Sequence, residues 1–233
     1  MLKNSGSRSI LLVILVLIYG SCRQNAVDPA SDESAYFPLQ AGDFWIYQVT
    51  QETYSPTNPY TKRVFQIQEK ITGTYTQKGQ VFFQVEESRR SSDQAVWQLN
   101  ALSTIYKNVS EVVSVTNNVP VITLLFPVAP TTEWNTNAYN ASPDTLLRYR
   151  DSRQPFSLGK TTFNHTISVV GENDSTLVTL TKNRRVYALN VGLVYRENAA
   201  LAYCQSSPDC IGKAQIESGT IQKWELLSSN RLP

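Results

Sequence analysis

The chain is a succession of short runs in which apolar and polar residues alternate, and this pattern constrains the fold more than any other feature of the sequence. Alternation places successive side chains on opposite faces of a β-strand, so each run predicts a half-buried strand. No segment of any length shows a helical period. The 12 Tyr, 8 Phe and 4 Trp residues, against a single Met, also favour pleated surface.

The runs number about ten to twelve, spaced roughly ten residues apart, which is typical of an antiparallel barrel or sandwich. They are 44–50, 64–76, 81–87, 95–106, 109–115, 119–128, 145–150, 161–170, 176–181, 184–197 and 220–227. Segments 77–80 and 171–175 are expected to be turns, and 127–143 is the one long irregular segment. The sequence therefore predicts an all-β fold, an antiparallel meander forming an open or closed, lipocalin-like β-barrel. A β-sandwich is the alternative.

The first residues of the chain have the parts of a signal peptide. Lys3 and Arg8 precede the unbroken apolar run 10–18, and small residues follow it. A membrane-spanning helix needs about 20 apolar residues, roughly twice the length of this run. We therefore expect an export signal rather than a permanent transmembrane helix.

The signal ends in Tyr19-Gly20-Ser21-Cys22, which resembles the lipobox of bacterial lipoproteins. In that family the signal is removed just before the cysteine, whose thiol and amine are then acylated. Tyr19 departs from the strictest lipobox, which has Leu, Val or Ile there, but relaxed forms are common in Bacteroidetes-type lipoproteins. The resemblance implies lipidation of Cys22, with palmitate as a typical acyl chain, and a membrane partner through this anchor. A plain secretory signal with an incidental Cys22 is the alternative.

The domain boundaries follow from this processing. Residues 1–21 are the expected lipoprotein signal peptide, the polar segment 22–35 a flexible tether, and 36–233 a single all-β domain. Loss of Lys3 and Arg8 with the signal leaves equal numbers of basic and acidic residues, so the mature chain has no net charge. That balance gives no reason to expect a nucleic-acid partner. The expected location is the bacterial envelope, at the outer membrane, on its periplasmic or surface face.

Two further cysteines, Cys204 and Cys210, flank the turn-like segment 205–209. Exported proteins fold in an oxidising compartment, so the two thiols are expected to form a disulfide. Closing so short a loop stabilises a fold by about 2 kcal/mol in the chain-entropy model, which makes this a local constraint. The spacing fits neither a redox pair nor a zinc knuckle, and we predict no metal and no cofactor.

Two stretches of the domain resemble uncharacterised Bacteroidetes-type envelope lipoproteins. They are the opening Phe37-Pro38-Leu39 with Gly42, Trp45 and Tyr47, and the late run 190–197, which contains Gly-Leu-Val-Tyr-Arg-Glu. The resemblance implies an envelope lipoprotein with a barrel-like domain and supplies no catalytic residues. We expect Trp45 and Tyr47 to anchor the core, and Gly192 to lie at a bend or a close approach.

The sequence offers little for catalysis. His165 is the only histidine and is expected to be a packed or rim residue, so sites with several His ligands are excluded. Glu86 and Glu87 are adjacent on a strand, point to opposite faces and cannot act together. Three basic clusters are expected to be solvated strand faces, with anionic lipid or polysaccharide as the alternative contact. They are Arg89-Arg90, Arg148 with Arg150 and Arg153, and Lys182 with Arg184-Arg185.

Three functions remain open. The first is a non-enzymatic lipoprotein whose barrel holds an apolar or lipid ligand, or which docks on an envelope partner; an all-polar interior would exclude the ligand carrier. The second is a surface module that binds glycan or protein, which requires its aromatic side chains to be exposed and clustered. Those side chains are Tyr54, Tyr60, Trp134, Tyr139 and Tyr203. The third is an envelope hydrolase, which requires a cleft that gathers acids, or His165 with a Ser and an Asp.

Overall fold

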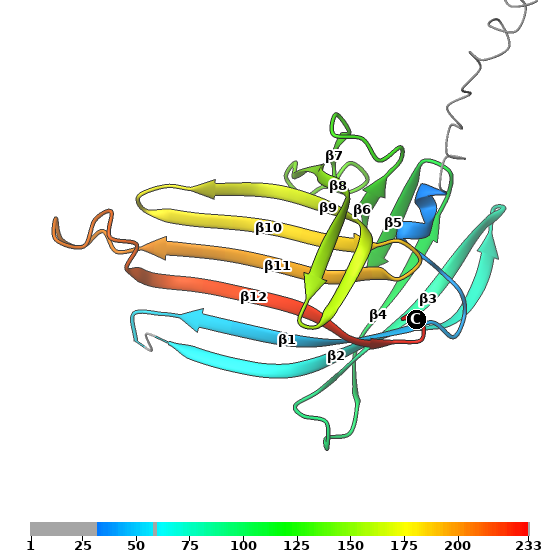
Figure 1. Ribbon diagram of the computed structural model, residues 1–233, viewed down its shortest axis with the longest axis horizontal. Coiled ribbons are helices and arrows are strands. Elements are labelled where there is room, and N and C mark those ends of the chain that lie inside the picture. The colour runs from blue at the N-terminus through cyan, green and yellow to red at the C-terminus, as the bar shows by residue number, and fades with distance from the viewer. Residues whose placement is uncertain (1–31, 58–59, 233) are drawn as a thin grey trace, which may run out of the picture. The chain divides into compact units, whose positions relative to one another are not determined.

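The computed structural model describes residues 32–57 and 60–232 (Figure 1). The expected signal peptide, Cys22 and most of the expected tether lie outside the described residues. Contacts divide the chain into residues 1–32 and a compact unit from Glu33 to Pro233. Among the described residues, one short 3₁₀ helix precedes a single sheet of twelve strands.

The strands follow η1 in chain order. The elements are η1 (Glu33–Tyr36), β1 (Phe44–Tyr54), β2 (Thr61–Gln77), β3 (Gln80–Arg90), β4 (Gln98–Lys107), β5 (Glu111–Thr116), β6 (Val119–Leu125), β7 (Glu133–Asn135), β8 (Leu146–Leu158), β9 (Thr161–Ser175), β10 (Thr179–Ala188), β11 (Gly192–Tyr203) and β12 (Ile216–Ser229).

The sheet is an antiparallel meander whose ends approach each other. The strand order is β6-β5-β4-β3-β2-β1-β12-β11-β10-β9-β8-β7, so β1 pairs with β12 and the edges are β6 and β7. These edges meet where the Ile122 amide donates to the Thr136 carbonyl at 2.9 Å and the Trp134 indole donates to the Ile122 carbonyl at 3.1 Å. The all-β and barrel predictions are confirmed, in a nearly closed barrel with more strands than a lipocalin.

The core begins on β1, as the alternation predicts. Trp45, Tyr47 and Val49 point to one side, with 7%, 0% and 0% of their surfaces exposed. The Tyr47 and Trp224 rings lie 5.5 Å apart, which joins the first strand to the last. Burying side chains of this size stabilises a fold by roughly 1.5–3 kcal/mol each, so this contact helps to hold the β1–β12 pairing.

Gly192 occupies the position that the sequence predicts for it. Its φ of +97° is a conformation that L residues with side chains rarely adopt, and an added Cβ would lie 3.3 Å from Trp45 Nε1. The same indole nitrogen donates to the Val191 carbonyl at 2.6 Å. The β10–β11 turn is therefore fitted against the first strand, as the expected bend and close approach require.

The N-terminal segment packs against the barrel earlier in the chain than expected. Residues 33–35, assigned from sequence to the tether, lie in η1, and Tyr36 is buried. The Lys107 ammonium donates to the carbonyls of Ser34 and Phe37 at 2.9 and 3.0 Å, and the Val128 amide donates to the Glu33 carboxylate. These contacts place the start of the folded unit at residue 33.

Two boundaries in the second half differ from the prediction. The expected turn 171–175 is part of β9, and the hairpin turn lies at 176–178, where the Thr176 hydroxyl accepts from the amides of Val178 and Thr179. The expected strand 184–197 is broken at 189–191, where Asn190 has a φ of +64°. Polar residues on the solvated face of a long strand look like a turn in sequence, and an apolar turn looks like a strand.

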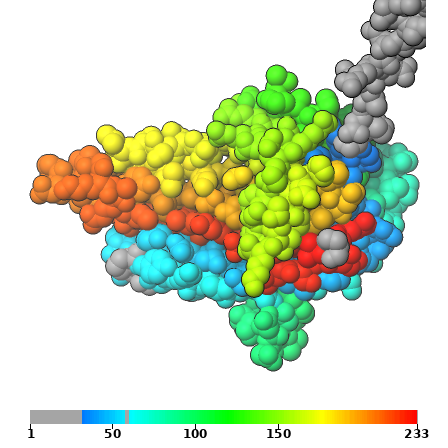
Figure 2. Space-filling view, in the orientation of Figure 1, coloured from blue at the N-terminus to red at the C-terminus, as the bar shows by residue number. Residues whose placement is uncertain are grey.

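The predicted disulfide between Cys204 and Cys210 is present, with the two Cα atoms 5.7 Å apart. It closes a turn-rich segment between β11 and β12. This segment forms the orange end of the extension made by β10, β11 and β12 (Figures 1 and 2). The disulfide therefore constrains a tip of the molecule, as the short loop predicts.

Candidate functional site

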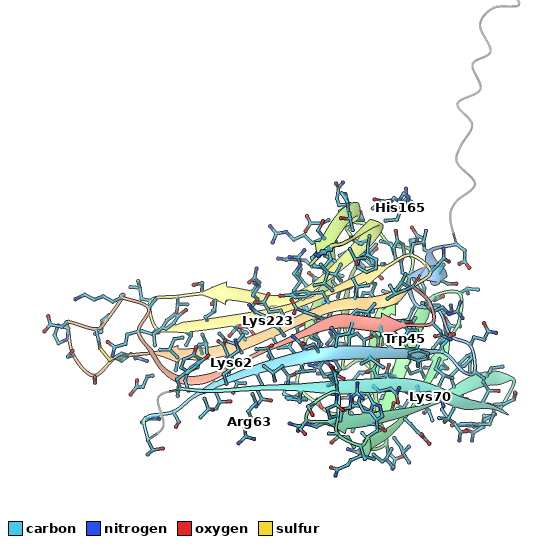
Figure 3. All side chains as sticks on the ribbon, turned by 60° about the horizontal axis from the view of Figure 1, so that its bottom comes forward. Trp45, Lys62, Arg63, Lys70, His165 and Lys223 are labelled. Atoms are coloured by element: carbon cyan, nitrogen blue, oxygen red, sulfur yellow. A yellow bond between two sulfur atoms is a disulfide. The ribbon has the colours of Figure 1, made fainter. Side chains whose placement is uncertain are left out.

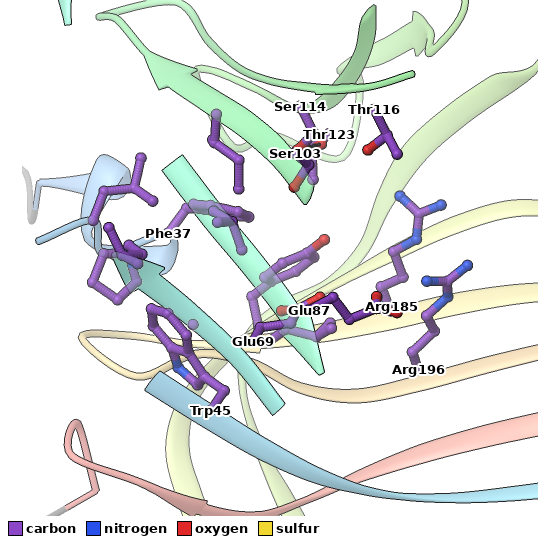
Figure 4. A pocket seen from close by; sticks show the side chains of 18 of the residues that line it. Phe37, Trp45, Glu69, Glu87, Ser103, Ser114, Thr116, Thr123, Arg185 and Arg196 are labelled. Atoms are coloured by element: carbon purple, nitrogen blue, oxygen red, sulfur yellow. Dashed lines mark hydrogen bonds between the residues drawn. The ribbon is translucent and has the colours of Figure 1, made fainter. Parts of the chain in front are cut away.

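A cavity of about 340 Å³ lies on the concave side of the sheet (Figure 4). Its lining comes from β1 to β6, from β10 and β11, and from the segment 37–39 that follows η1. The apolar part of the lining includes Phe37, Leu39, Trp45, Ile71, Val85 and Ile105. The polar part combines hydroxyl groups with four charged side chains, so the interior is neither wholly apolar nor wholly polar.

The serine and threonine hydroxyl groups of the lining come from the strands of the first half. They belong to Ser103, Ser114, Thr116 and Thr123, and the Ser114 and Thr123 hydroxyls lie 3.0 Å apart. Phe37 lies elsewhere in the lining, where its ring is 6.0 Å from that of Tyr187. The N-terminal segment thus contributes apolar surface to the same cavity that these hydroxyl groups line.

Two of the charged groups are carboxylates on neighbouring strands. Glu69 of β2 and Glu87 of β3 are directly opposite each other in the register, and both line the cavity. A β-bulge between Ile71 and Gly73 creates this pairing, because the register nearer the turn would place Ser88 opposite Glu69. Bulges re-aim side chains and are frequent beside functional sites.

The other two charged groups are guanidinium groups, also on neighbouring strands. Arg185 of β10 and Arg196 of β11 are opposite each other, and both line the cavity. A bulge between Val186 and Tyr187 sets this register too, and without it Tyr195 would lie opposite Arg185. Each half of the sheet therefore contains one bulged hairpin that brings like charges together inside the cavity.

No ion pair within residues 32–57 and 60–232 joins these carboxylates to these guanidinium groups; the pairs found there involve other side chains. The pKa of Glu69 is raised to about 7, chiefly by burial and also by the charge of Glu87, while Arg196 opposes the shift. Burial also lowers the pKa of Arg196, with Arg185 adding to that effect. Near neutral pH, Glu69 is thus poised between its two protonation states.

The aromatic residues proposed from sequence as ligand contacts do not form one surface. Tyr54 and Tyr60 pair with each other, with ring centroids 5.4 Å apart. Tyr139 is 52% exposed and its hydroxyl donates to Glu111, whereas Trp134 is only 6% exposed and Tyr203 is buried. None of the five lines the cavity. The condition set for the surface-module hypothesis, exposed and clustered aromatic side chains, is not met.

The remaining candidates are placed as follows. His165, labelled in Figure 3, is exposed and is absent from the cavity lining. Glu86 is absent from the lining that contains Glu87, in keeping with the expected opposite faces. Arg185, expected on a solvated face, lines the cavity instead. Glu69 and Arg196 were not singled out from sequence, because no local pattern reveals which cross-strand partner a bulge selects.

Within the described ranges, no group of His, Cys, Asp or Glu side chains is arranged to hold a metal ion. Among the same residues, no helix is long and apolar enough to cross a membrane. The side chains that line the cavity offer chemistry of their own. They can bury apolar surface, donate hydrogen bonds from guanidinium groups and accept them at carboxylates.

No family model matches the chain, and no curated protein matches it. Two solved structures resemble it. One, assigned as a lipoprotein from Parabacteroides distasonis, is 11% identical with a TM-score of 0.39, and the match covers 82% of this chain and 98% of that one. The other, assigned as an exported protein with a YmcC-like fold from Bacteroides fragilis, is 11% identical with a TM-score of 0.38, over 83% and 98%. Likenesses this distant support no argument about function.

Proposed function

We propose that this chain is a non-enzymatic lipoprotein of the bacterial envelope, anchored to the outer membrane through Cys22, which binds an apolar or amphipathic small molecule in its barrel. The observation that carries the binding proposal is the interior cavity of about 340 Å³. Small-molecule sites are typically concave, roughly 300–1,000 Å³, and mostly apolar, with a few convergent polar groups. The lining described above has this composition.

The energetics favour an amphipathic occupant. Apolar ligand surface placed against Trp45, Ile71 and Ile105 would contribute roughly 25 cal/mol for each Å² removed from water. The charged groups in the same lining would remain solvated or be matched by polar groups of the ligand, because burying unmatched charge is costly. Docking on an envelope protein remains the alternative within the same class of function.

Native mass spectrometry followed by organic extraction tests this proposal. The chain is exported by its own signal, purified from bacterial membranes without denaturation, and compared with an Ala101→Phe variant that fills part of the cavity. A co-purifying small molecule at near-stoichiometric level, lost in the variant, supports binding inside the barrel. A clean protein mass in both, together with no uptake of an apolar fluorophore, overturns it. Ala200→Phe, on the exposed side of β11, is the matched control.

Labelling with palmitate tests the anchor. Cys22→Ser should abolish incorporation of the label and release the protein from the membrane fraction, since each buried methylene of an acyl chain contributes about 0.8 kcal/mol and two chains give stable attachment. Cys204→Ser should leave both unchanged, because its partner is Cys210. Labelling that persists in Cys22→Ser would contradict the lipobox interpretation.

A second candidate function is hydrolysis by the two carboxyls. The observation that favours it is that Glu69, with its raised pKa, lies beside Glu87. Retaining glycosidases place two carboxyls about 5 Å apart, which neighbouring strands can provide. Turnover of aryl glycosides that Glu69→Gln and Glu87→Gln both abolish would replace the binding proposal. No turnover above that of either variant would leave binding as the function of the cavity.

A further inference from the structure

We propose that the cavity selects an amphipathic zwitterion, whose cationic group lies between Glu69 and Glu87 and whose acidic group contacts Arg185 and Arg196. This inference rests on the proposed function, since it assumes that the cavity holds a ligand, and it adds the chemical class of that ligand. It is carried by the two like-charged pairs and by the bulges that create them.

Like charges placed directly opposite each other on neighbouring strands destabilise a sheet. This barrel contains two such pairs of opposite sign in one cavity, and neither pair is neutralised by an ion pair to the other. A register without the bulges would have avoided both. A ligand that carries both charges would offset both repulsions at once, whereas a simple anion or cation would offset one and leave the other.

The chemistry of each pair suits one half of a zwitterion. Guanidinium groups present N–H donors in a fixed fork that matches the oxygens of carboxylates and phosphates. The carboxylate pair has aromatic neighbours, because Trp45 is the cross-strand partner of Glu69 on β1 and lines the same cavity. A cation is attracted to carboxylates and to the faces of aromatic rings.

The apolar surface lies where a hydrocarbon group could accompany such a head group. Figure 4 shows Phe37 and Trp45 on one side of the cavity, Arg185 and Arg196 on the other, and Glu69 between them. The cavity thus grades from apolar to charged. That gradation favours a ligand with an alkyl or ring portion rather than a small hydrophilic zwitterion.

The test is isothermal titration calorimetry on the mature chain with Cys22→Ser, exported behind a cleavable secretory signal so that no detergent competes for the cavity. Four probes share an octyl chain and differ in charge: octylphosphocholine, octanoate, octylammonium and octanol, each below its micelle concentration, at a pH of about 8, above the Glu69 pKa. Octylphosphocholine should bind at least about tenfold more tightly than the others, a difference of about 1.4 kcal/mol.

Variants locate the two charges. The double changes Glu69→Gln with Glu87→Gln, and Arg185→Gln with Arg196→Gln, should each weaken octylphosphocholine by about tenfold or more and should not weaken octanol, which carries no charge. Glu86→Gln should change the affinity for neither probe, because Glu86 does not line the cavity. If a double variant does not fold, Glu87→Gln and Arg185→Gln alone serve the same purpose, with circular dichroism as the check.

The possible outcomes separate this inference from the proposed function. Equal affinity for all four probes, or octanoate or octylammonium binding as tightly as octylphosphocholine, overturns the zwitterion and leaves an apolar or singly charged ligand. Binding of octylphosphocholine that neither double variant weakens overturns the assignment of the charged pairs. If no probe binds and no apolar fluorophore enters the cavity, the proposed function itself fails.

Discussion

The two halves of the sheet, β1–β6 and β7–β12, each place a pair of like charges in the cavity, and the two pairs have opposite sign. Each half has one bulged hairpin that aligns like charges inside the cavity, acids on β2 and β3, bases on β10 and β11. They differ in how the charge can change. Burial brings Glu69 to a pKa of about 7, whereas an arginine pair stays charged at any ordinary pH. The charge of the acidic pair can therefore change near neutral pH, whereas the charge of the basic pair cannot.

The largest expected effect comes from the change in protonation of Glu69. A carboxyl whose pKa is about 4.5 when unfolded and about 7 when folded binds more protons in the native state between those values. Folding stability should therefore fall as pH rises from about 4.5 to 7, by on the order of 3 kcal/mol. Glu69→Gln should remove this slope and be the more stable protein at pH 8. Urea unfolding at several pH values measures the slope, and an unchanged slope in Glu69→Gln contradicts the raised pKa of Glu69.

A pair of glycine substitutions compares the two hairpins directly. Gly79 in the β2–β3 turn and Gly192 at the start of β11 both have positive φ, +80° and +97°, but only the second has neighbours, Trp45 among them, within reach of an added Cβ. Both Ala variants should lose roughly 1–2 kcal/mol from backbone strain. Gly192→Ala should lose more, with a change in tryptophan fluorescence. Equal losses in thermal unfolding would show that the turn is not fitted against β1.

The variant Glu87→Gln tests the repulsion between the two carboxylates, and its expected effect on stability is smaller. Removing one member of a like-charged cross-strand pair should stabilise the fold by up to about 1 kcal/mol at pH 8, where Glu69 is ionised. The gain should disappear at pH 4, where Glu69 is protonated in both proteins. Glu86→Gln, absent from the cavity lining, is the control. A gain that is independent of pH would mean that the two carboxylates do not interact.

The smallest effect concerns the coupling between the halves. Arg196 lowers the Glu69 pKa, so Arg196→Gln should shift the titration of the Glu69 carboxyl carbon to higher pH in NMR. Arg185 is not among the groups that shift the Glu69 pKa, so Arg185→Gln should leave this titration unchanged. Identical titrations in the two variants would mean that the two arginines affect the Glu69 pKa equally, which contradicts this prediction.

Local patterns of the sequence predict those features that depend only on residues near one another in the chain. Alternation in β1 predicts the burial of Trp45 and Tyr47, and the export context predicts the bond between Cys204 and Cys210, because each inference needs only near neighbours. The charged site depends on register. One extra residue, Thr72, decides whether Glu69 opposes Glu87 or Ser88, and no propensity distinguishes the two.

The positions of the aromatic side chains could not be predicted for a related reason. Trp134 lies in a Pro-, Thr- and Asn-rich segment that looks like a loop, but the three residues of β7 pair with β8 and turn the indole inward, against Tyr149. A strand this short is too brief to show alternation in sequence. Only the approach of the two sheet edges makes that position part of the interior.

The pairing of β1 with β12 has a consequence for biogenesis. The cavity is lined by strands from both halves, and the halves are joined side by side through hydrogen bonds to the last strand, Ile216–Ser229. The first strand therefore keeps an unpaired edge until the carboxyl-terminal residues arrive, and such distant pairings form slowly. An exported chain would leave its translocation channel with this edge open. Any molecule enclosed by the barrel would have to be acquired after export, from whatever the envelope supplies.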